Sequence, residues 1–449
     1  MVVGEFTTQV DVAVIGAGAA GIAAALEAAD RGRTVALVTH GDGQRVAGAG
    51  PDLDDCQAAG ITVVPGDAVF RDGRSLAIPD NALIPRLRFR RAILAIDGLP
   101  AAPAWAADVA EHHRSTANLI ADDLEEHDAG GADAIAVLVA GGSVADIAAA
   151  ATLAGRTPES ADRITLVPGA DGLLPDVDAD LRARMAALLA ERMIVEPPSG
   201  VLTAAQSGAR LTVAGDDVAP RIVDRIFTGT SASPAPGELR LDATGVTFQD
   251  GAFPVDASLR TADPRVFAAG PSIRIDGGPG PRTDAEWAAS GRLAAAGACG
   301  EPGQWIDPLP SAAIQFGTCP SGGAAFVAWC GPSPEDPDAA DGADDILWFT
   351  GERAADAAAS ASTAAWCRLG VDRASGLLVA AAVVAGGRAP EFNELLLAVE
   401  MAAEPADLAG IARPCRTALS TTIARVAAAA AEGSDSSASP SAAPRTVRA

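Results

Sequence analysis

The sequence predicts an α/β fold with two strand–turn–helix units, followed from about residue 309 by an α+β domain. Glycine turns near residues 16 and 141 each follow a short apolar stretch rich in β-branched residues, which is typical of a buried parallel strand. Each turn leads into an alanine-rich stretch that favours a helix. Beyond residue 309, short predicted strands precede two predicted helices, as in a small antiparallel sheet with helices on one side. A chain of 449 residues has room for about three domains.

The first unit carries the stronger motif. Residues 10–15 predict a strand, residues 22–29 a helix and residues 34–38 a second strand, and Gly-Ala-Gly-Ala-Ala-Gly lies between the first two. In such a unit the first glycine permits a tight turn, the second lets the backbone approach a diphosphate, and the third lets the helix pack on the strand. The N–H groups that begin the helix then face the anion. The motif predicts a dinucleotide site, against the alternative of a glycine-rich turn without a ligand. The expected contact residues are Gly16, Gly18, Ala19, Ala20 and Gly21.

The second unit has the same order of elements and a weaker motif. An apolar stretch at 134–139 is followed by Ala-Gly-Gly-Ser-Val-Ala, a predicted helix over 148–153 and a strand over 164–167. Alanine then stands at the first and third glycine positions, as Ala140 and Ala145. The pattern indicates a Rossmann-like unit and leaves two alternatives open, a weak dinucleotide site or no ligand. The candidate contact residues are Gly141, Gly142, Ser143 and, after a later strand, Gly229.

The remaining elements complete a division into five segments. A buried strand ends at Gly270 and is followed by a predicted helix over 285–296. We expect one dinucleotide-binding unit in a segment at 1–130, a second in a segment at 131–250, a further strand and helix at 251–303, an α+β domain at 304–431, and a disordered Ser/Ala/Pro-rich tail at 432–449.

Composition excludes several classes of partner. The net charge is -25, and the 33 basic residues are all arginine, since the sequence contains no lysine. An acidic surface disfavours nucleic acid and anionic membranes, because phosphate binding needs clustered cations. No apolar run reaches the roughly 18 residues of a membrane helix. The first ten residues carry Glu5 and no basic stretch, which does not fit a signal peptide. We expect a cytoplasmic protein with neither nucleic acid nor a membrane as partner.

Cysteine and histidine spacing predicts no metal site. Six cysteines and four histidines occur without a CxxC or CxxxxC pair. Isolated cysteines of this kind are usually small buried apolar residues. Cys56 has a second interpretation, as a redox centre built on one cysteine. Asp52, Asp54 and Asp55 precede it, and their charges would raise its thiol pKa and disfavour the thiolate.

The order of these motifs resembles the flavin-dependent pyridine nucleotide-disulfide oxidoreductases, such as dihydrolipoamide dehydrogenase, glutathione reductase and mercuric reductase. The resemblance covers about residues 9–430, and includes Thr228-Gly229, the strand that ends at Gly270, and the segments 375–386 and 391–402. It implies an NAD-type domain inserted in an FAD-type domain, with FAD at the first turn, NAD(P)H at the second, and a homodimer formed through the C-terminal domain. Besides the first turn, Thr39, His40 and Gly270 are the residues that it places beside FAD.

The sequence also departs from that family at functional positions. The redox pair of cysteines four residues apart is missing, and Cys56 is the only cysteine in its region. At the positions of the family's two ribose-binding acids, this sequence has Thr39 and Pro168. At the position of the aspartate near the flavin it has Pro271. The family's catalytic His-Pro aligns with Arg413-Pro414, and the glutamate that orients the histidine aligns with Ala418.

These departures leave two functions open. The first is a flavin oxidoreductase that passes hydride from NAD(P)H to an unknown small acceptor without a protein disulfide, because a bound flavin carries that chemistry itself. The second is a non-catalytic relative that serves as a dimeric scaffold or sensor. Thiol–disulfide exchange requires a thiol pair, so the sequence argues against a disulfide reductase. Alanine at the presumed glycine positions and Pro168 predict weak NAD(P)H binding.

Overall fold

The computed structural model describes most of the chain and divides it into two compact units. One unit combines Met1–Ala101 with Thr230–Pro308, and the other consists mainly of Asp123–Gly229 and Leu309–Ala449. The described residues are 7–39, 52–96, 103–115, 136–156, 163–208, 210–228, 239–276, 280–281, 283–306, 309, 311–318, 323–334, 345–353, 365–413, 417–434 and 445–447.

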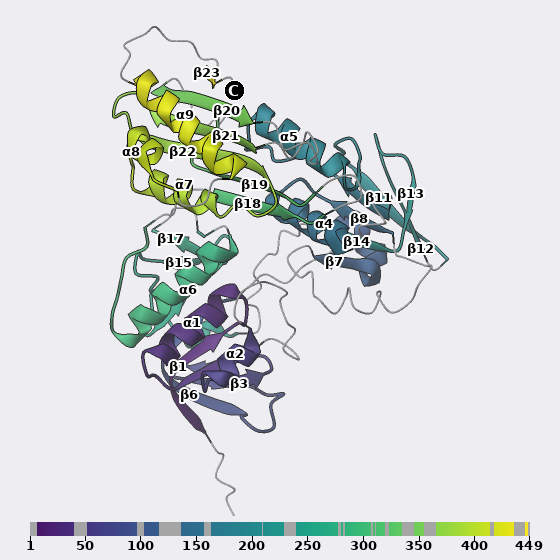
Figure 1. Ribbon diagram of the computed structural model, residues 1–449. Helices are drawn as coiled ribbons and strands as arrows, with labels where there is room; N and C mark the ends of the chain where they lie inside the picture. The colour runs from purple at the N-terminus through teal and green to yellow at the C-terminus, as the bar shows by residue number, and fades with distance from the viewer. Residues whose placement is uncertain are drawn as a thin grey trace, which may run out of the picture. The chain divides into compact units, whose positions relative to one another are not determined.

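The first unit is built on a sheet with the order β3-β2-β1-β6-β5-β4, in which β16 also pairs with β6; Figure 1 labels β1, β3 and β6 of this sheet. The strands β1, β2, β3, β6 and β16 are parallel to their neighbours, whereas β4 and β5 form an antiparallel extension. The strands are β1 (Thr8–Ile15), β2 (Val35–Thr39), β3 (Thr62–Pro65), β4 (Val69–Asp72), β5 (Ser75–Ala77), β6 (Arg86–Leu94) and β16 (Val266–Ala268), with β15 (Phe253–Val255) and β17 (Ile273–Ile275) pairing separately.

Small residues allow the helices of this unit to pack closely. The helices α1 (Ala19–Asp30) and α6 (Asp284–Cys299) contact each other along their length (Figure 1). A Cβ at Gly291 would collide with the backbone of Ala20, so this crossing requires glycine. The third helix, α2 (Leu53–Ala58), has only six residues, and a short 3-10 helix η4 covers Leu241–Ala243. The β-branched residues of β1 and β2 form the centre of the core.

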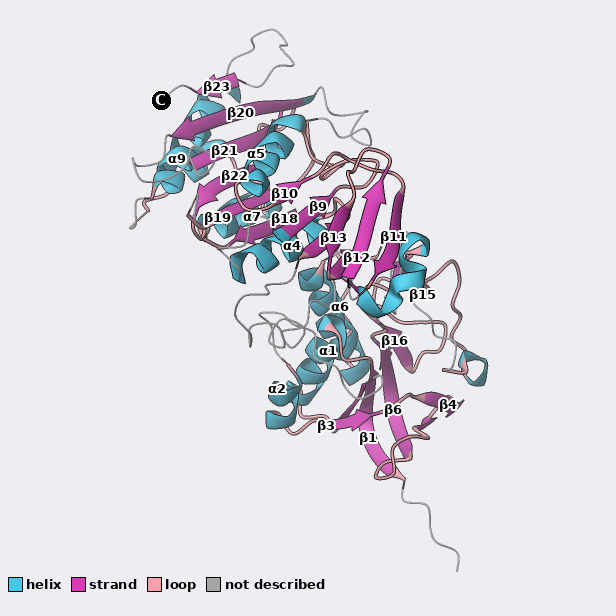
Figure 2. Cartoon of the chain, turned by 90° about the vertical axis from the view of Figure 1, so that its right-hand side faces the viewer, coloured by secondary structure: helices cyan, strands magenta, loops and turns pink. Residues whose placement is uncertain are grey.

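The second unit contains a parallel five-stranded sheet with the order β10-β9-β8-β14-β7. Its order of strand, glycine turn and helix matches the predicted second Rossmann-like unit, and Figure 2 shows its strands from a second direction. The elements are η1 (Ala104–His112), β7 (His113–Ser115), β8 (Val137–Ala140), α4 (Val144–Arg156), β9 (Ile164–Val167), α5 (Ala179–Ala190), β10 (Ile194–Val195) and β14 (Arg225–Thr228), beside a three-stranded antiparallel sheet of β11 (Leu202–Ser207), β12 (Arg210–Gly215) and β13 (Arg221–Val223).

The same unit includes the C-terminal α+β part. Its mostly antiparallel sheet has the order β18-β19-β22-β21-β20-β23, and the helices pack on one face through an apolar core (Figure 2). The elements are β18 (Ser311–Phe316), β19 (Ala325–Cys330), β20 (Ile346–Arg353), β21 (Ala365–Asp372), β22 (Leu378–Gly386), α7 (Glu391–Glu400), α8 (Pro405–Gly410), α9 (Ala418–Ser434) and β23 (Arg445–Val447).

Two boundaries differ from those that the sequence predicts. The chain passes between the units near residues 101 and 229 instead of 130 and 250. The reason is strand pairing: β7 joins β14 in the second unit, and Leu239 accepts a hydrogen bond from the Phe70 N–H in the first unit. The tail predicted to be disordered is partly regular, because α9 runs to Ser434 and β23 pairs with β20, whose open edge can accept a further strand.

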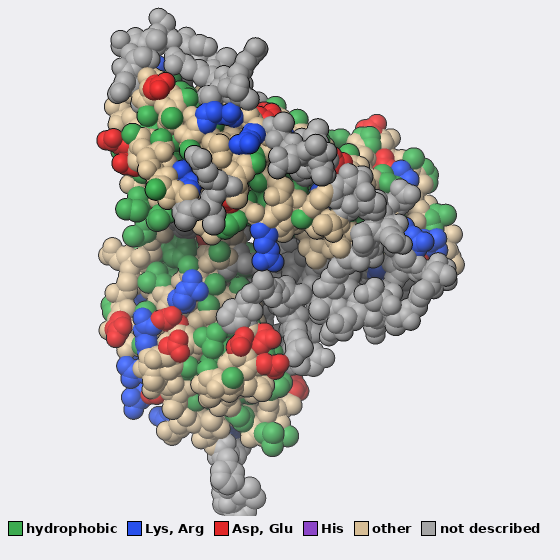
Figure 3. Space-filling view, viewed as in Figure 1, with side chains coloured by type: hydrophobic (Ala, Val, Ile, Leu, Met, Phe, Trp, Pro, Cys, Tyr) green, Lys and Arg blue, Asp and Glu red, His purple; other side chains and the backbone are tan. Residues whose placement is uncertain are grey.

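In the described part of the chain, no helix is long and apolar enough to cross a membrane. The face drawn in Figure 3 carries acidic and arginine side chains close to one another with apolar side chains between them. On this face, charges of both signs therefore lie among apolar side chains.

Candidate functional site

The first glycine turn lies at the carboxyl edge of the parallel sheet in the first unit. Gly16 directly follows β1, and its N–H donates to the carbonyl of Val38 in β2 at 2.9 Å. Its φ of 108° is in the left-handed region that favours glycine, and a Cβ there would collide with the carbonyl oxygen of Ala95. A Cβ at Gly21 would likewise collide with the Gly16 carbonyl. Both glycines are therefore required by the close packing of β1, α1 and β6.

The N-terminus of α1 has no negatively charged neighbour of its own. Gly18 is the N-cap, it contributes no side-chain hydrogen bond, and the first turn of the helix contains no acid. The first N–H groups of a helix have no partner within the helix, and they carry a partial positive charge. Gly18, Ala19 and Ala20 therefore offer N–H groups of the kind that bind an anion, and their contact with a diphosphate stays a prediction.

Thr39 ends β2 at the same edge of the sheet. Its side chain is only 2% exposed, and among the described residues its hydroxyl has no hydrogen-bond partner. An unsatisfied buried hydroxyl is unfavourable, so a hydrogen bond from a ligand hydroxyl that reached this oxygen would be stabilising. His40, the other predicted ribose contact, lies outside the described residues.

Gly270 completes this edge from the far part of the sequence. It follows β16 with a φ of 89°, and its N–H donates to the Ser290 hydroxyl of α6 at 3.0 Å. A Cβ there would approach the Ala20 Cβ to 3.1 Å. The structure thus brings together every described residue that the sequence predicts for the first site, and the glycine turn, the free helix N-terminus and the Thr39 hydroxyl fit the diphosphate and ribose of FAD.

The second turn is shifted by one residue from the alignment that the sequence suggests. Ala140 is the last residue of β8 and is paired on both sides, so its methyl group does not hinder the turn. Gly141 has the φ of 142° and donates to Val167 at 2.9 Å, which is the role that Gly16 plays in the first turn. Helix α4 then begins at Val144, three residues after Gly141, as α1 begins three residues after Gly16.

This register places Asp146 where the first turn has Gly21. The Asp146 side chain is 3% exposed and accepts hydrogen bonds from the Ser143 hydroxyl at 2.7 Å and the Ser143 N–H at 3.1 Å. A Cβ at Gly141 would collide with this carboxylate, which shows how close it lies to the turn. The protein's own carboxylate therefore occupies the N-terminus of α4, where a dinucleotide would place its diphosphate.

The remaining second-site predictions have mixed outcomes. Gly142 lies beside Gly172, and its carbonyl accepts a hydrogen bond from the Leu174 N–H at 2.9 Å. Pro168, at the predicted ribose position, offers only its carbonyl, which already accepts from the Ser199 N–H at 3.0 Å. Gly229 lies outside the described residues. The sequence argument missed Asp146, because the predicted helix over 148–153 begins after it, whereas the observed helix begins at Val144 and has this acid in its first turn.

Cys56 lies in the short helix α2 and is fully buried. Burial first, and then the charges of Asp55 and Asp52, raise its pKa to about 11. These aspartates form a capping box at the start of α2, so they serve the helix. The four described cysteines are free, and no group of three or more His, Cys, Asp or Glu in the described chain could hold a metal. The arrangement supports the interpretation of Cys56 as a small buried residue.

Arg413, which the resemblance aligns with the catalytic histidine, is bound within its own domain. Its guanidinium pairs with Glu394 of α7 and donates to the carbonyl of Leu408 at 3.1 Å. A guanidinium stays protonated at working pH, so it cannot exchange protons as histidine does. Ala418, at the position of the orienting glutamate, is simply the first residue of α9.

A glycine-turn unit at each parallel sheet, with an α+β domain after them, defines the class of flavoproteins with two dinucleotide-binding domains. A model of the pyridine nucleotide-disulphide oxidoreductase family matches residues 86–289, and a model of an FAD binding domain matches residues 11–50. The matches and the fold support the flavin-dependent pyridine nucleotide-disulphide oxidoreductase family, and with it FAD and NAD(P)H as cofactors.

Solved structures show the same fold at low sequence identity. The NAD-dependent persulfide reductase of A. fulgidus is 18% identical, with 95% of this chain and 84% of that chain covered at a TM-score of 0.74. The HOCl-induced flavoprotein disulfide reductase RclA of Escherichia coli, solved as a Cu(II) complex, is 15% identical, with 94% and 99% covered at 0.71. A pyridine nucleotide-disulfide family oxidoreductase from Enterococcus faecalis V583 is 16% identical, with 95% and 100% covered at 0.71. The likeness extends over nearly the whole chain.

Proposed function

We propose that the protein is an FAD-dependent oxidoreductase that passes hydride from NAD(P)H to a small acceptor without a protein disulfide. The observation that carries the proposal is the first glycine turn, whose helix has no acidic residue in its first turn and no side-chain cap among the described residues. The flavin supplies the hydride-transfer chemistry when it is bound. The chain's part is to hold the diphosphate on the N–H groups of Gly18, Ala19 and Ala20 and a ribose hydroxyl on Thr39.

The described cysteines support a reaction without a disulfide. Cys56 has no cysteine four residues away, is buried, and has a thiol pKa of about 11, so its thiolate is scarce at neutral pH. Arg413 is held by Glu394 and cannot act as the proton carrier of a dithiol reaction. Free, buried cysteines also fit the expected cytoplasmic location, where thiols stay reduced.

The second turn supports weak or conditional NAD(P)H binding. The Asp146 carboxylate already accepts the Ser143 N–H and hydroxyl that would contact a diphosphate. A nucleotide must therefore displace this side chain or bind with its diphosphate elsewhere, and either route lowers affinity. We include NAD(P)H as the electron donor because the chain belongs to a pyridine nucleotide family, and expect a dissociation constant well above the micromolar range.

We also propose a homodimer formed through the C-terminal domain. Leu397 and Met401 lie four residues apart at the end of α7 and are 59% and 72% exposed, and Ile411 after α8 is 45% exposed. Exposed large apolar side chains on one helix face are typical of a contact surface. A monomeric mass by light scattering at micromolar concentration would contradict this part of the proposal.

A non-catalytic relative remains the second candidate, favoured by the carboxylate at the second turn and by the loss of the thiol pair and histidine. One experiment separates the two. Purified protein is incubated with excess FAD, desalted, and examined for flavin absorbance and for NAD(P)H oxidation with oxygen or a quinone. We expect yellow protein with slow turnover. Protein that remains colourless contradicts the enzyme, and yellow protein without turnover supports a flavin-binding scaffold.

A further inference from the structure

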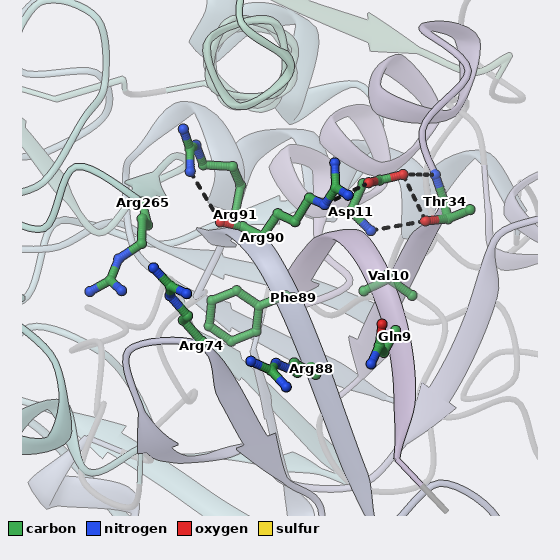
Figure 4. A pocket seen from close by; sticks show the side chains of 10 residues that line it. All are labelled: Gln9, Val10, Asp11, Thr34, Arg74, Arg88, Phe89, Arg90, Arg91 and Arg265. Carbon is green, nitrogen blue, oxygen red and sulfur yellow. Dashed lines mark hydrogen bonds and ion pairs between the residues drawn. The ribbon is translucent and has the colours of Figure 1, made fainter.

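A hollow of about 630 Å³ lies at the opposite edge of the first unit's sheet (Figure 4). Residues from the start of β1, the start of β6, and the positions just before β2 and β16 line it. This is the amino edge of the parallel strands, whereas the glycine turn follows their carboxyl ends. The eight residues of β1 separate the two edges by roughly 25 Å at about 3.3 Å per residue. The hollow is therefore distinct from the first dinucleotide site.

Arginine dominates the lining of the hollow, although the chain as a whole carries a charge of -25. Three of these arginines come from the sequence Arg88-Phe89-Arg90-Arg91 of β6. Asp11 is the only acid among the lining residues, and it accepts hydrogen bonds from the Thr34 hydroxyl at 2.9 Å and the Thr34 N–H at 3.1 Å. The lining arginines are Arg74, Arg88, Arg90, Arg91 and Arg265.

Two of the five arginines are engaged by carboxylates. Arg265 binds Asp263 with two hydrogen bonds of 3.0 and 2.9 Å, and the Arg90 Nε lies 3.6 Å from Asp11. Figure 4 shows the Arg90 guanidinium directed toward Asp11.

The other three keep their guanidinium groups free of ion pairs within the described chain. The Arg91 guanidinium donates to the carbonyl of Arg90 at 3.2 Å. Arg88 and Asp72 attract each other electrostatically without forming an ion pair. The Arg74 backbone N–H donates to Asp72 at 2.7 Å, and its side chain has no carboxylate partner among the described residues. Figure 4 shows Arg74 and Arg88 on either side of Phe89. Unpaired cations around one hollow attract a ligand with several anionic oxygens.

We propose that this hollow binds a compact polyanion with at least two linked phosphate groups, recognised through its phosphate chain. Guanidinium groups match phosphate oxygens in pairs, and several separate guanidiniums need more than one phosphate to bind them. Phe89 is only 3% exposed, so it offers no face on which a nucleobase could stack. The overall charge of -25 repels a long nucleic acid, which leaves a short phosphate chain as the ligand that fits.

The test is calorimetry of the full chain with sodium tripolyphosphate at low salt, both before and after loading with FAD. We expect saturable binding of one ligand per chain, unchanged by FAD, so the outcome does not depend on the proposed function. Arg74→Ala with Arg88→Ala should weaken binding by about tenfold or more, and the corresponding double Lys variant by less, because charge is kept and the planar fork is lost. Arg274→Ala, at an arginine of the same unit outside the hollow, is the matched control and should change affinity by less than about twofold.

Comparison of ligands sharpens the assignment. ATP and tripolyphosphate should bind within about threefold of each other, because the phosphate chain alone is recognised. Absence of saturable binding, or binding that the double Ala variant leaves unchanged, overturns the proposal. So does ATP binding that is more than about tenfold tighter, orthophosphate binding as tight as that of tripolyphosphate, or tighter binding of a single-stranded oligonucleotide at the same arginines.

Discussion

The two glycine turns have nearly the same backbone and opposite electrostatics. In each, a glycine with positive φ follows the strand, donates to the neighbouring strand, and is followed three residues later by a helix. At the sixth position the first turn has Gly21 and the second has Asp146. Among the described residues, the first helix therefore begins without an acid in its first turn, whereas the second helix begins beside a carboxylate of the protein. The comparison teaches that the fold of a dinucleotide site and its capacity to bind an anion can be separated by one side chain.

In the second unit, helix α5 also begins beside a carboxylate of the protein. Asp178 caps the N-terminus of α5 and pairs with Arg368 of β21, and both side chains are at least 94% buried. The Arg368 guanidinium also lies 5.0 Å from the ring centre of Trp366. In this unit, carboxylates of the protein accept hydrogen bonds from N–H groups at the start of α4 and α5. In the first unit, we expect a ligand to accept the corresponding hydrogen bonds at the start of α1.

The largest effect should follow from breaking this internal pair. We expect Arg368→Ala to lower the free energy of unfolding by about 3–5 kcal/mol, because it leaves Asp178 buried without its partner charge. Denaturant unfolding measures it. Arg184→Ala is the control: that arginine also contacts Trp366 and an acid, but its side chain is 25% exposed, so the expected loss is about 1 kcal/mol or less. Equal losses in the two variants would show that burial of the pair is unimportant.

The next largest effect should follow from a substitution that gives the first turn a carboxylate, as the second turn has. Ala19→Asp adds a carboxylate to the first turn of α1, which favours the helix but opposes a diphosphate. At about 5 Å and an effective dielectric constant of about 20, the repulsion is roughly 3 kcal/mol, so FAD affinity should fall on the order of 100-fold. Fluorescence titration with FAD measures this change.

Ala19→Asn is the matched control for that substitution, since it has the same shape without the charge. It should keep FAD affinity within about fivefold of the parent protein. If the two variants lose affinity equally, the free helix N-terminus is not the reason that FAD binds.

The converse substitution removes the negative charge from the second turn and should strengthen NADH binding there. Asp146→Asn removes the negative charge at the N-terminus of α4 while keeping the shape of the side chain. We expect affinity for NADH to rise by about tenfold, since one repulsive charge is removed near the diphosphate. Calorimetry measures it, with Asp180→Asn at the start of α5 as the control. An unchanged or lower affinity would mean that Asp146 does not compete with the nucleotide.

How far the sequence could predict this arrangement depends on what fixes each part. The strands and the first turn were predictable, because β-branched runs and glycine spacing are local signals. The register of the second turn was not, because Ala140 can end a strand or begin a turn, and only its pairing with Val167 and Thr228 decides. The arginine hollow was also hidden, since Arg74, Arg88 and Arg265 meet only through strand pairing. The family models and the structural comparisons support the family and the two cofactors, whereas the individual contacts at each site remain predictions.

The smallest effect concerns Cys56, the only cysteine in the region where the family has its thiol pair. The chain contains neither lysine nor tyrosine, so cysteines are the side chains that titrate between about pH 9 and 11. The pKa of Cys56 is raised to about 11 in the folded protein by burial and by Asp55 and Asp52, against 9.0 ordinarily. Between these values the unfolded chain has released a proton that the folded chain still holds, so stability falls as pH rises.

Cys56→Ala should therefore flatten part of the stability decrease between about pH 9 and 11 and leave NAD(P)H oxidation at neutral pH unchanged. Part of the slope should persist, because Cys330 and Cys367 are also buried and have pKa values raised to about 12. Urea unfolding at several pH values measures the slope, and alkylation by iodoacetamide at pH 8 should be slow in the folded parent protein, since only a minute fraction of a thiol with this pKa is ionised. Acceptor-dependent turnover that Cys56→Ala abolishes would instead identify the lone cysteine as a redox centre, because a buried structural thiol has no means of controlling the rate of hydride transfer.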